Sequence, residues 1–221
     1  MSELLFNELP RPTFRWLRVN HTVSSLAGED TAVQSIAVET NKDILSPLPV
    51  GTALLDGNYE GANKEAVHVL VEKAEGYAIN VPPKAKEVVG IRIDANARVA
   101  NRFQFIVGEG AELEVQFYVT GSGDALTNVS YLNEYDVKEA GKVVVKKVNL
   151  LPEHVQHIEH RYTKLEEKAD VEYINIEIGG SENILNYYHD LVGQESRMVH
   201  DIAYLGNKEQ KFDISMVMSW W

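Results

Sequence analysis

A short pattern recurs four times in the second half of this sequence, and it limits the folds open to the chain more than any other feature. The copies are GAELEV at 110–115, AGKVVV at 140–145, KADVEY at 168–173 and ESRMVH at 195–200, so they follow one another at a nearly constant step. In each copy a small residue and a polar residue are followed by apolar residues at every second position, the period of a half-buried strand. Units repeated at a near-constant step bury their apolar faces against one another. The repeat therefore predicts a stack of β-coils.

The segments around the repeats fit the same interpretation. Each copy has a continuation and then a return strand, so we expect three short strands per coil. The continuations are 116–121, 146–151, 174–180 and 201–206, and the return strands are 128–137, 155–163, 184–192 and 211–218. Further strands are expected at 77–81, 88–93 and 103–107. A parallel β-helix or flattened β-solenoid is favoured over a sandwich, because the only Asn-Gly or Asp-Gly hairpin signal, Asp56-Gly57, lies outside the repeats.

The N-terminal part is expected to be an extended arm over residues 1–30, followed by a β-helix core over 31–221. Pro10 and Pro12 interrupt any continuous helix there. Segment 32–38 is expected to form a strand. Segment 66–72 suits either a strand or a short helix, and we favour a strand because Val67, Val69 and Val71 alternate with other residues.

Composition narrows the classes of function. The 21 basic and 33 acidic residues give a net charge of −12, which disfavours nucleic acid as a partner. The 221 residues include no cysteine, so disulfides, thiolate metal sites and Cys nucleophiles are excluded. Neither a secretion signal nor a membrane-spanning segment is found, so we expect a soluble, cytoplasmic protein without membrane insertion.

Several segments together resemble the SufB/SufD family, and its SufD branch in particular. The segment PTFRWLRVN at 12–20 resembles the SufD N-terminal signature, and INVP at 79–82 with IRI at 91–93 resembles the entry into the β-helix. FIVGEGAEL at 105–113, the segment 167–180 and LVG at 191–193 resemble the coils that follow. Their order and spacing cover roughly residues 12–215.

This resemblance implies a right-handed parallel β-helix and a role in iron–sulfur cluster assembly by the SUF system. It also implies pairing as SufB–SufD or like-with-like dimers, and recruitment of SufC, an ABC-type ATPase, through C-terminal helices. The chain departs from the family pattern in stopping at Trp220-Trp221, before further coils and a helical tail, and in having no cysteine for a cluster. The first difference puts ATPase docking in doubt. The second means that thiolates must come from a partner.

Histidines and paired carboxylates are the remaining candidates for chemistry. His154, His157 and His160 invite a metal interpretation, but on a strand His157 shares a face with Glu159 while His160 lies on the other face. His189 and His200 lie in neighbouring coils and are expected to be able to meet. For all five, structural or solvated histidines are favoured over a metal site. The pairs Glu112/Glu114 and Glu166/Glu167 are expected on a solvated face. We therefore assign no catalytic, cofactor-binding or metal residue and expect no cofactor.

The sequence thus predicts an all-β, non-enzymatic, SufD-like component of iron–sulfur cluster assembly. Its expected partners are a SufC-like ABC ATPase and a SufB-like scaffold, and it is expected to form a homodimer. The exposed aromatic pair at the end of the last return strand supports pairing through that end. The alternative is a β-helix that acts on or binds polysaccharide, which requires a secretion signal and a carboxylate- or aromatic-lined groove. A third possibility is a structural relative that no longer joins the assembly machinery.

Overall fold

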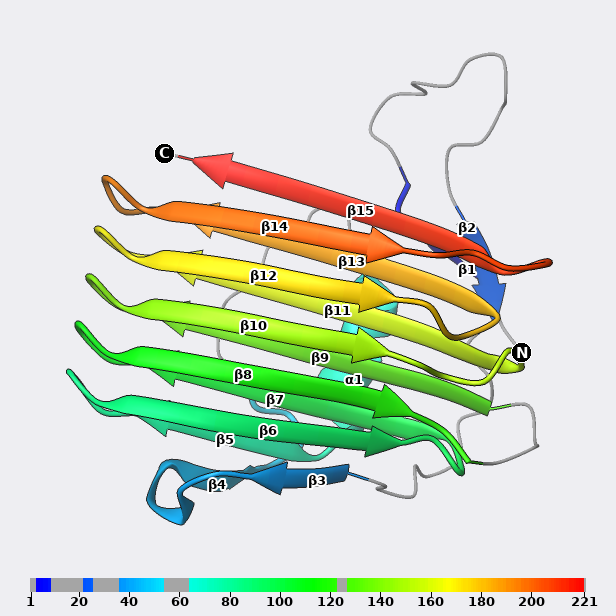
Figure 1. The fold of residues 1–221 in the computed structure, drawn as a ribbon, viewed down its shortest axis with the longest axis horizontal. Coiled ribbons are helices and arrows are strands. Elements are labelled where there is room, and N and C mark those ends of the chain that lie inside the picture. Colours follow the sequence, from blue (N-terminus) through cyan, green and yellow to red (C-terminus); the bar gives the residue numbers. More distant parts are fainter. Residues whose placement is uncertain (1–2, 9–21, 26–35, 54–63, 123–126, 221) are drawn as a thin grey trace.

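Two parallel β-sheets face each other in the computed structural model, which describes residues 3–8, 22–25, 36–53, 64–122 and 127–220 (Figure 1). The front sheet has the order β14-β12-β10-β8-β6-β3, and the back sheet has the order β15-β13-β11-β9-β7-β5-β4. The front-sheet strands are β3 (Ile36–Glu39), β6 (Lys86–Asp94), β8 (Glu112–Thr120), β10 (Lys142–Asn149), β12 (Asp170–Glu177) and β14 (Arg197–Tyr204). The back-sheet strands are β4 (Leu45–Leu48), β5 (Gly76–Val81), β7 (Val99–Val107), β9 (Thr127–Val137), β11 (Val155–Leu165), β13 (Glu182–Leu191) and β15 (Lys211–Trp220).

The chain alternates between the two sheets, and each strand from β5 to β13 pairs in parallel with the strand one coil later. The result is a β-solenoid of about five turns, so the predicted fold class is confirmed. One detail of the prediction was wrong, because each coil contains two long strands and not three short ones. The repeated pattern and its continuation form one uninterrupted strand, as in β8, where inward and outward residues alternate along the whole length.

The tight corner that leads into each front-sheet strand has a residue in left-handed conformation. Five such residues stand at equivalent places in successive coils, with φ between 55° and 63°: Lys84, Gly110, Ala140, Lys168 and Glu195. The amide of each of the first four donates a hydrogen bond to a carbonyl in the corner of the next coil, as Ala140 N does to Glu167 O at 2.8 Å. Only Gly110 occupies this conformation without a steric penalty. The corner geometry is therefore set by stacking rather than by glycine.

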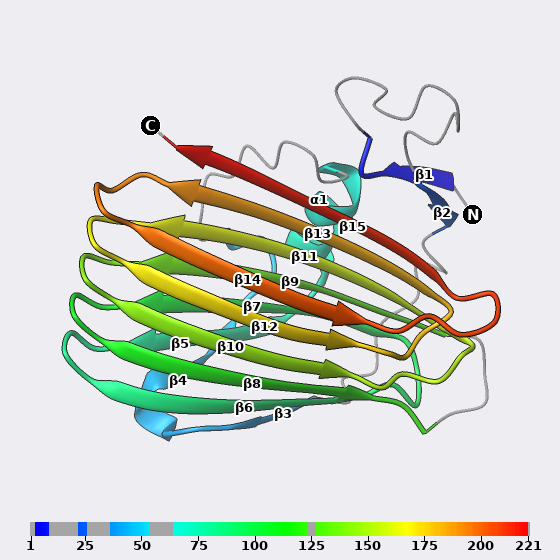
Figure 2. The ribbon, with the colours of Figure 1, turned by 45° about the horizontal axis from the view of Figure 1, so that its top comes forward.

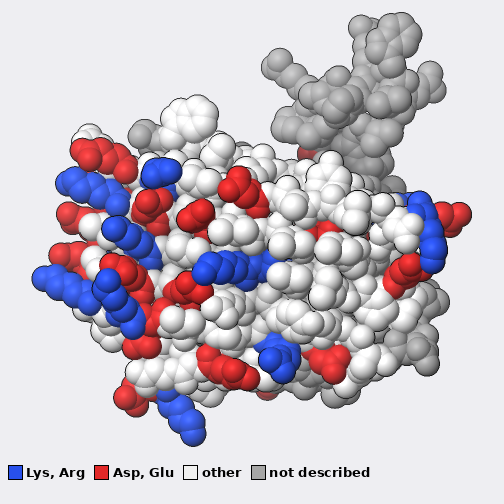
Figure 3. Space-filling view, in the orientation of Figure 1, with Lys and Arg blue, Asp and Glu red and all other residues white. Residues whose placement is uncertain are grey.

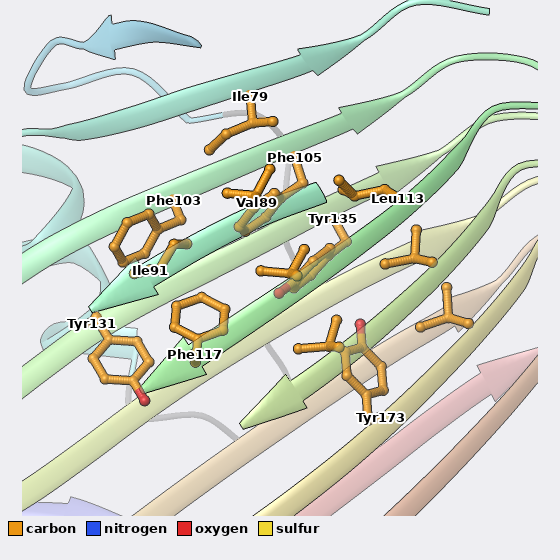
Figure 4. Packing of buried hydrophobic residues seen from close by; sticks show 14 of the residues in the cluster. Ile79, Val89, Ile91, Phe103, Phe105, Leu113, Phe117, Tyr131, Tyr135 and Tyr173 are labelled. Atoms are coloured by element: carbon orange, nitrogen blue, oxygen red, sulfur yellow. The ribbon is translucent and has the colours of Figure 1, made fainter. Parts of the chain in front are cut away.

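We call the coils next to β3 and β4, at the bottom of Figure 1, the lower coils, and those next to β14 and β15 the upper coils. The lower coils enclose a continuous apolar core (Figure 4). Aromatic rings in mutual contact run through it. Phe105 and Tyr135 stack with ring centroids 4.5 Å apart, and Phe117 and Tyr131 stack at 6.1 Å. Phe105 and Tyr135 belong to neighbouring coils, whereas Phe117 and Tyr131 lie on the two facing strands of one coil. The rings therefore hold both the stacked coils and the two sheets in place.

The lower end of the solenoid is closed by two short strands that run against the rest. β3 pairs antiparallel with β6, and β4 pairs antiparallel with β5 (Figure 2). Both have four residues, and Pro47 lies inside β4. A short helix η1 (Lys42–Ile44) joins them and buries Ile44 against the core. Short edge strands and a proline leave little backbone for a further strand to pair with.

The outer side of the back sheet is covered by N-terminal elements. Helix α1 (Lys64–Lys73) packs Val67 and Leu70 against Leu132 of β9. The prediction of a strand at 66–72 was therefore wrong. The buried residues Ala66, Val67 and Leu70 lie on one face of the helix, whereas Val69, one of the alternating valines that suggested a strand, is only partly buried.

A second cover lies higher on the same side. Strands β1 (Glu3–Phe6) and β2 (Thr22–Ser25) form an antiparallel pair. Leu4 and Phe6 pack against Ile158 and Ile184 of the back sheet. Most of residues 1–30 and most of segment 32–38 lie outside the described residues, so the division of the chain at residue 30 stays a prediction.

Candidate functional site

Polar and charged side chains replace apolar ones inside the upper coils. The strand register makes the change visible in columns of equivalent inward positions. In the front sheet the column Ile91, Phe117, Lys147, Asn175 changes from apolar to polar between the second and third residue. In the back sheet Tyr131 is followed by Glu159 at the equivalent position one coil later. The register thus carries charged groups into the space that hydrophobic side chains fill below.

Four of these side chains form an ionic cluster: Lys147, Glu159, Arg161 and Glu177. Lys147 Nζ lies 2.5 Å from Glu159 Oε2 and 2.5 Å from Glu177 Oε1. Arg161 Nη2 donates to Glu159 Oε1 at 2.6 Å. All four side chains are fully buried. Two cations and two carboxylates balance in charge, which is the condition for keeping such groups out of water.

Aromatic rings and amides complete the shell of the ionic cluster. The Arg161 guanidinium carbon lies 4.3 Å from the ring centroid of Tyr173 and 4.4 Å from that of Tyr187, so two rings hold the cation. Asn133 Nδ2 donates to Glu159 Oε1 at 3.0 Å, and the Tyr187 hydroxyl donates to Glu159 Oε2 at 3.3 Å. Glu159 is thus the hub of the cluster.

The two carboxylates respond differently to this environment. Burial alone would raise the pKa of Glu159, but attraction to Arg161 and Lys147 outweighs it and holds that pKa well below its ordinary value. For Glu177 burial dominates and raises the pKa, and Lys147 offsets only part of the increase. Glu159 therefore keeps its charge more firmly than Glu177 does.

A neutral hydrogen-bonded group adjoins the ionic cluster. Asn149 Nδ2 donates to Glu177 Oε2 at 3.0 Å and to Asn183 Oδ1 at 2.9 Å, and lies 3.1 Å from His157 Nδ1. His157 Nε2 lies 3.0 Å from the Tyr131 hydroxyl. Burial first, and then Lys147, lowers the pKa of His157 to about 3, so its imidazole is neutral at physiological pH.

His189 and His200 meet near the upper end of the interior, as the repeat predicts. Their ring centroids are 5.9 Å apart, and each also approaches the ring of Tyr173. Burial and then Arg161 lower the pKa of His200 to about 3. Burial, His200 and Arg161 lower the pKa of His189 well below its ordinary value. Both imidazoles are neutral.

The other three candidate histidines are not brought together. His157 and Glu159 face the interior, whereas His160 faces outward and is covered by Phe6 with ring centroids 6.4 Å apart. The prediction that the strand separates these residues onto opposite faces is confirmed. Burial lowers the pKa of His160 to about 4. His154 lies in the turn before β11.

The candidate carboxylate pairs lie at the surface with lysine partners. Glu112 pairs with Lys86 at 2.8 Å, and Glu114 pairs with Lys146 at 2.9 Å. Glu166 and Glu167 make the same kind of contact with other lysines. Figure 3 shows charged side chains gathered along the left edge of the front face, where the chain turns into β6, β8, β10, β12 and β14. Each carboxylate is matched by a cation rather than aimed at a cleft.

The ionic cluster was missed by the sequence reasoning, although a signal for it exists. Alternation along β10 places Val143, Val145, Lys147 and Asn149 on one face. Extending the inward period past the two valines would have placed Lys147 and Asn149 inside. The same alternation along β12 places Tyr173 and Glu177 on one inward face. The repeat fixed which residues point inward, but polar residues were assumed to point outward.

The ionic cluster is closed off from solvent, which does not suit a catalytic site. The members of the ionic cluster have no exposed side-chain surface, so a substrate in solution does not reach them. Among residues 3–8, 22–25, 36–53, 64–122 and 127–220, no group of three or more His, Asp or Glu side chains is placed to hold a metal ion. The single α-helix in this part of the chain is too short to cross a bilayer.

Comparison with known protein families identifies a match. The family model described as "SUF system FeS cluster assembly, SufBD core domain" matches residues 91–220, more than half of the chain. The matched region runs from β6 to the end of β15 and includes the whole ionic cluster. Searches of curated proteins and of solved structures returned no match.

Proposed function

Because this chain belongs to the SufB/SufD family and carries its core domain, we propose that it is a SufD-like, non-catalytic component of iron–sulfur cluster assembly in the cytoplasm. In this role the solenoid is a rigid scaffold for a SufC-like ABC ATPase and a SufB-like partner. The family match over residues 91–220 is the observation that carries the proposal. The absence of cysteine from the sequence supports a SufD-like over a SufB-like role, because cluster thiolates would come from the partner.

The upper end of the solenoid is the surface we propose for pairing. Among the described strands, β14 and β15 each have a neighbour on one side only. Trp220 is 75% exposed, and Tyr204 and Leu205 are also exposed at this end. A strand edge with free backbone groups and exposed apolar side chains favours pairing with a second β-edge. The occupant would be a SufB-like chain or a second copy.

Co-purification with SufB-like and SufC-like proteins from the same genome tests the assignment. We expect both to be retained by the intact chain. Trp220→Glu should weaken retention of the SufB-like partner, while Val88→Glu, which changes an exposed apolar side chain of β6 far from that end, should not. Failure to retain either partner would count against the proposal.

Homodimer formation is tested separately by sedimentation at micromolar concentration. The expected result is a dimer that Trp220→Glu converts to monomer. A monomer at all concentrations removes the homodimer but leaves pairing with a SufB-like chain to the co-purification. The polysaccharide alternative is not favoured, since the candidate carboxylates Glu112 and Glu114 are each paired with a lysine.

A further inference from the structure

The upper end of the interior combines two methionines with two histidines. Met216 and Met218 lie on β15 in register with Tyr187 and His189 of β13, so they occupy inward columns of the back sheet. His189 and Met218 are direct neighbours in adjacent parallel strands, where side chains on one face stand about 4.8 Å apart. Met216 and Met218 are 38% and 46% exposed, because no further coil covers them in the described chain.

The imidazoles beside these methionines have unused ring nitrogens. Within the described residues, neither nitrogen of His189 has a hydrogen-bond partner, nor does Nδ1 of His200. His200 Nε2 lies 2.9 Å from Asn175 Nδ2, which fixes the orientation of the ring. Buried polar atoms without a partner are uncommon and call for an explanation such as a missing ion. Each of these imidazoles has a free nitrogen that could serve as a ligand.

We propose that this end of the solenoid binds one soft monovalent metal ion, of the class of Cu(I), through the thioethers of Met216 and Met218 and the imidazoles of His189 and His200. All four groups come from β13, β14 and β15, so one chain supplies the complete set. The site does not depend on the role proposed above in cluster assembly.

The chemistry of the ligands selects the ion. Thioether sulfur is a soft ligand that favours Cu(I), and imidazole also suits copper. Carboxylates that would favour a hard divalent ion are absent from these columns: Asp190 and Asp201 lie at the alternate, outward positions of their strands. The Arg161 guanidinium packs against Tyr187, which itself contacts His200 at 4.8 Å between ring centroids. A nearby positive charge disfavours a divalent ion more than a monovalent one.

The orientation of the His200 ring also fits. Asn175 Nδ2 lies 2.9 Å from His200 Nε2 and holds the ring in place, so Nδ1 is the nitrogen left for a metal ion.

Anaerobic titration of the full chain with Cu(I), in competition with bathocuproine disulfonate, tests the site. We expect one ion per chain. In the double variant Met216→Leu/Met218→Leu the affinity should fall by at least about tenfold, because direct ligands matter more than the outer-shell groups whose loss costs about 10–100-fold. Met198→Leu is the matched control, since Met198 is an inward methionine of the same coil that packs on the apolar core. Its affinity should stay within about twofold of the wild-type value, since leucine replaces methionine with little change in volume.

Wild-type chain labelled at the methionine methyl groups provides a second measurement that needs no variant of the site. Adding Ag(I), a redox-inert soft ion, should shift the signals of Met216 and Met218 and leave that of Met198 in place. No binding of Cu(I), equal binding by the double variant, or unshifted Met216 and Met218 signals would each overturn the proposal.

Discussion

The lower and upper coils share one backbone geometry but differ inside, because the apolar core continues into the upper coils at one end of the strands while charged groups fill the other end. Phe117 and Tyr131 stack in the lower half, and the equivalent positions one coil later are Lys147 and Glu159, which form an ion pair. The strand register passes through this change without a break. The comparison shows that backbone hydrogen bonds and stacked corners set the solenoid, while the interior is free to vary in chemistry so long as it is filled and its charges are matched.

The two interiors should differ in what they tolerate. An apolar core responds mainly to volume, since every missing methylene loses packing contacts. A buried ionic cluster responds mainly to the identity of its groups, because removing one partner leaves another charge without compensation. A buried ion pair adds little net stability compared with apolar residues of similar size. Stability alone therefore does not account for the ionic cluster.

Acid should act most strongly on the upper half. Burial lowers the pKa of His157 and His200 to about 3 and that of His160 to about 4, and lowers that of His189 too. Below the ordinary histidine pKa of 6.5, the unfolded chain therefore binds more protons than the folded chain. These histidines do not lower the free energy of unfolding above that pH, but they lower it progressively as the pH falls below it. Each contributes a slope of about 1.4 kcal/mol per pH unit. Glu159, whose pKa is lowered, adds a loss only at still lower pH.

Urea unfolding between pH 7 and pH 4.5 measures this effect. The free energy of unfolding should decrease steeply, and the variant His160→Leu should show a slope smaller by about one proton. This variant removes a titrating group while keeping an apolar contact with Phe6. A stability independent of pH over this range contradicts the prediction.

Lys147→Met should be the most damaging single substitution in the ionic cluster. It leaves the carboxylates of Glu159 and Glu177 without their shared cation, and breaking a buried pair in this way costs about 3–5 kcal/mol. Lys146→Met is the matched control, because it changes the adjacent, outward-facing lysine that pairs with Glu114 at the surface. Exposed ion pairs contribute little, so the control should leave the free energy of unfolding nearly unchanged in the same urea titration. Equal effects of the two substitutions would remove the distinction between the halves.

A pair of substitutions within one column compares the two interiors directly. Ile93 and Asn149 occupy the same inward column, two coils apart. Asn149→Leu should cost about 2–4 kcal/mol, because Glu177 and Asn183 each lose a hydrogen-bond donor. Ile93→Val, which removes one methylene, should cost about 0.5–1.5 kcal/mol. Denaturant unfolding of both variants measures the difference, and the reverse order of costs would show that the upper half is governed by volume as well.

The smallest expected effect concerns the corners that both halves share. Ala140→Gly should stabilise the chain by about 0.5–1 kcal/mol. The substitution relieves the left-handed strain at this residue, and the greater freedom of glycine in the unfolded chain offsets only part of that gain. Ala169→Gly, at a buried corner position without positive φ, should destabilise the chain by a similar amount. Thermal unfolding of the pair gives the two signs, and destabilisation by both would show that the corner is not strained.

The fold could be predicted from the sequence because the same strand pattern recurs in each coil. Four copies at a near-constant step specify parallel stacking, and the alternation in each copy specifies which side faces inward. Helix α1 was missed because Val67, Val69 and Val71 mimic the period of a strand, while the contact of Val67 and Leu70 with Leu132 depends on tertiary packing. Propensity is a weak guide where tertiary contacts decide.

The ionic cluster could not be predicted in the same way, for a different physical reason. A buried lysine is acceptable only when its counter-charges lie within contact distance, and those of Lys147 come from β11 and β12, which follow it in the chain. A single strand does not reveal this partnership. The spacing did predict that His189 and His200 meet, because both lie on successive strands at the same end of the stack.

The antiparallel strands β3 and β4 determine how far copies of this solenoid can associate along its axis. Among the described strands they leave only four-residue edges at the lower end, one of them interrupted by Pro47. Head-to-tail growth needs two complementary ends on every molecule, and without both it does not proceed into a fibre. Contact between copies through the edges of β14 and β15, as proposed above, would therefore stop at a closed pair and would not continue into an open-ended polymer.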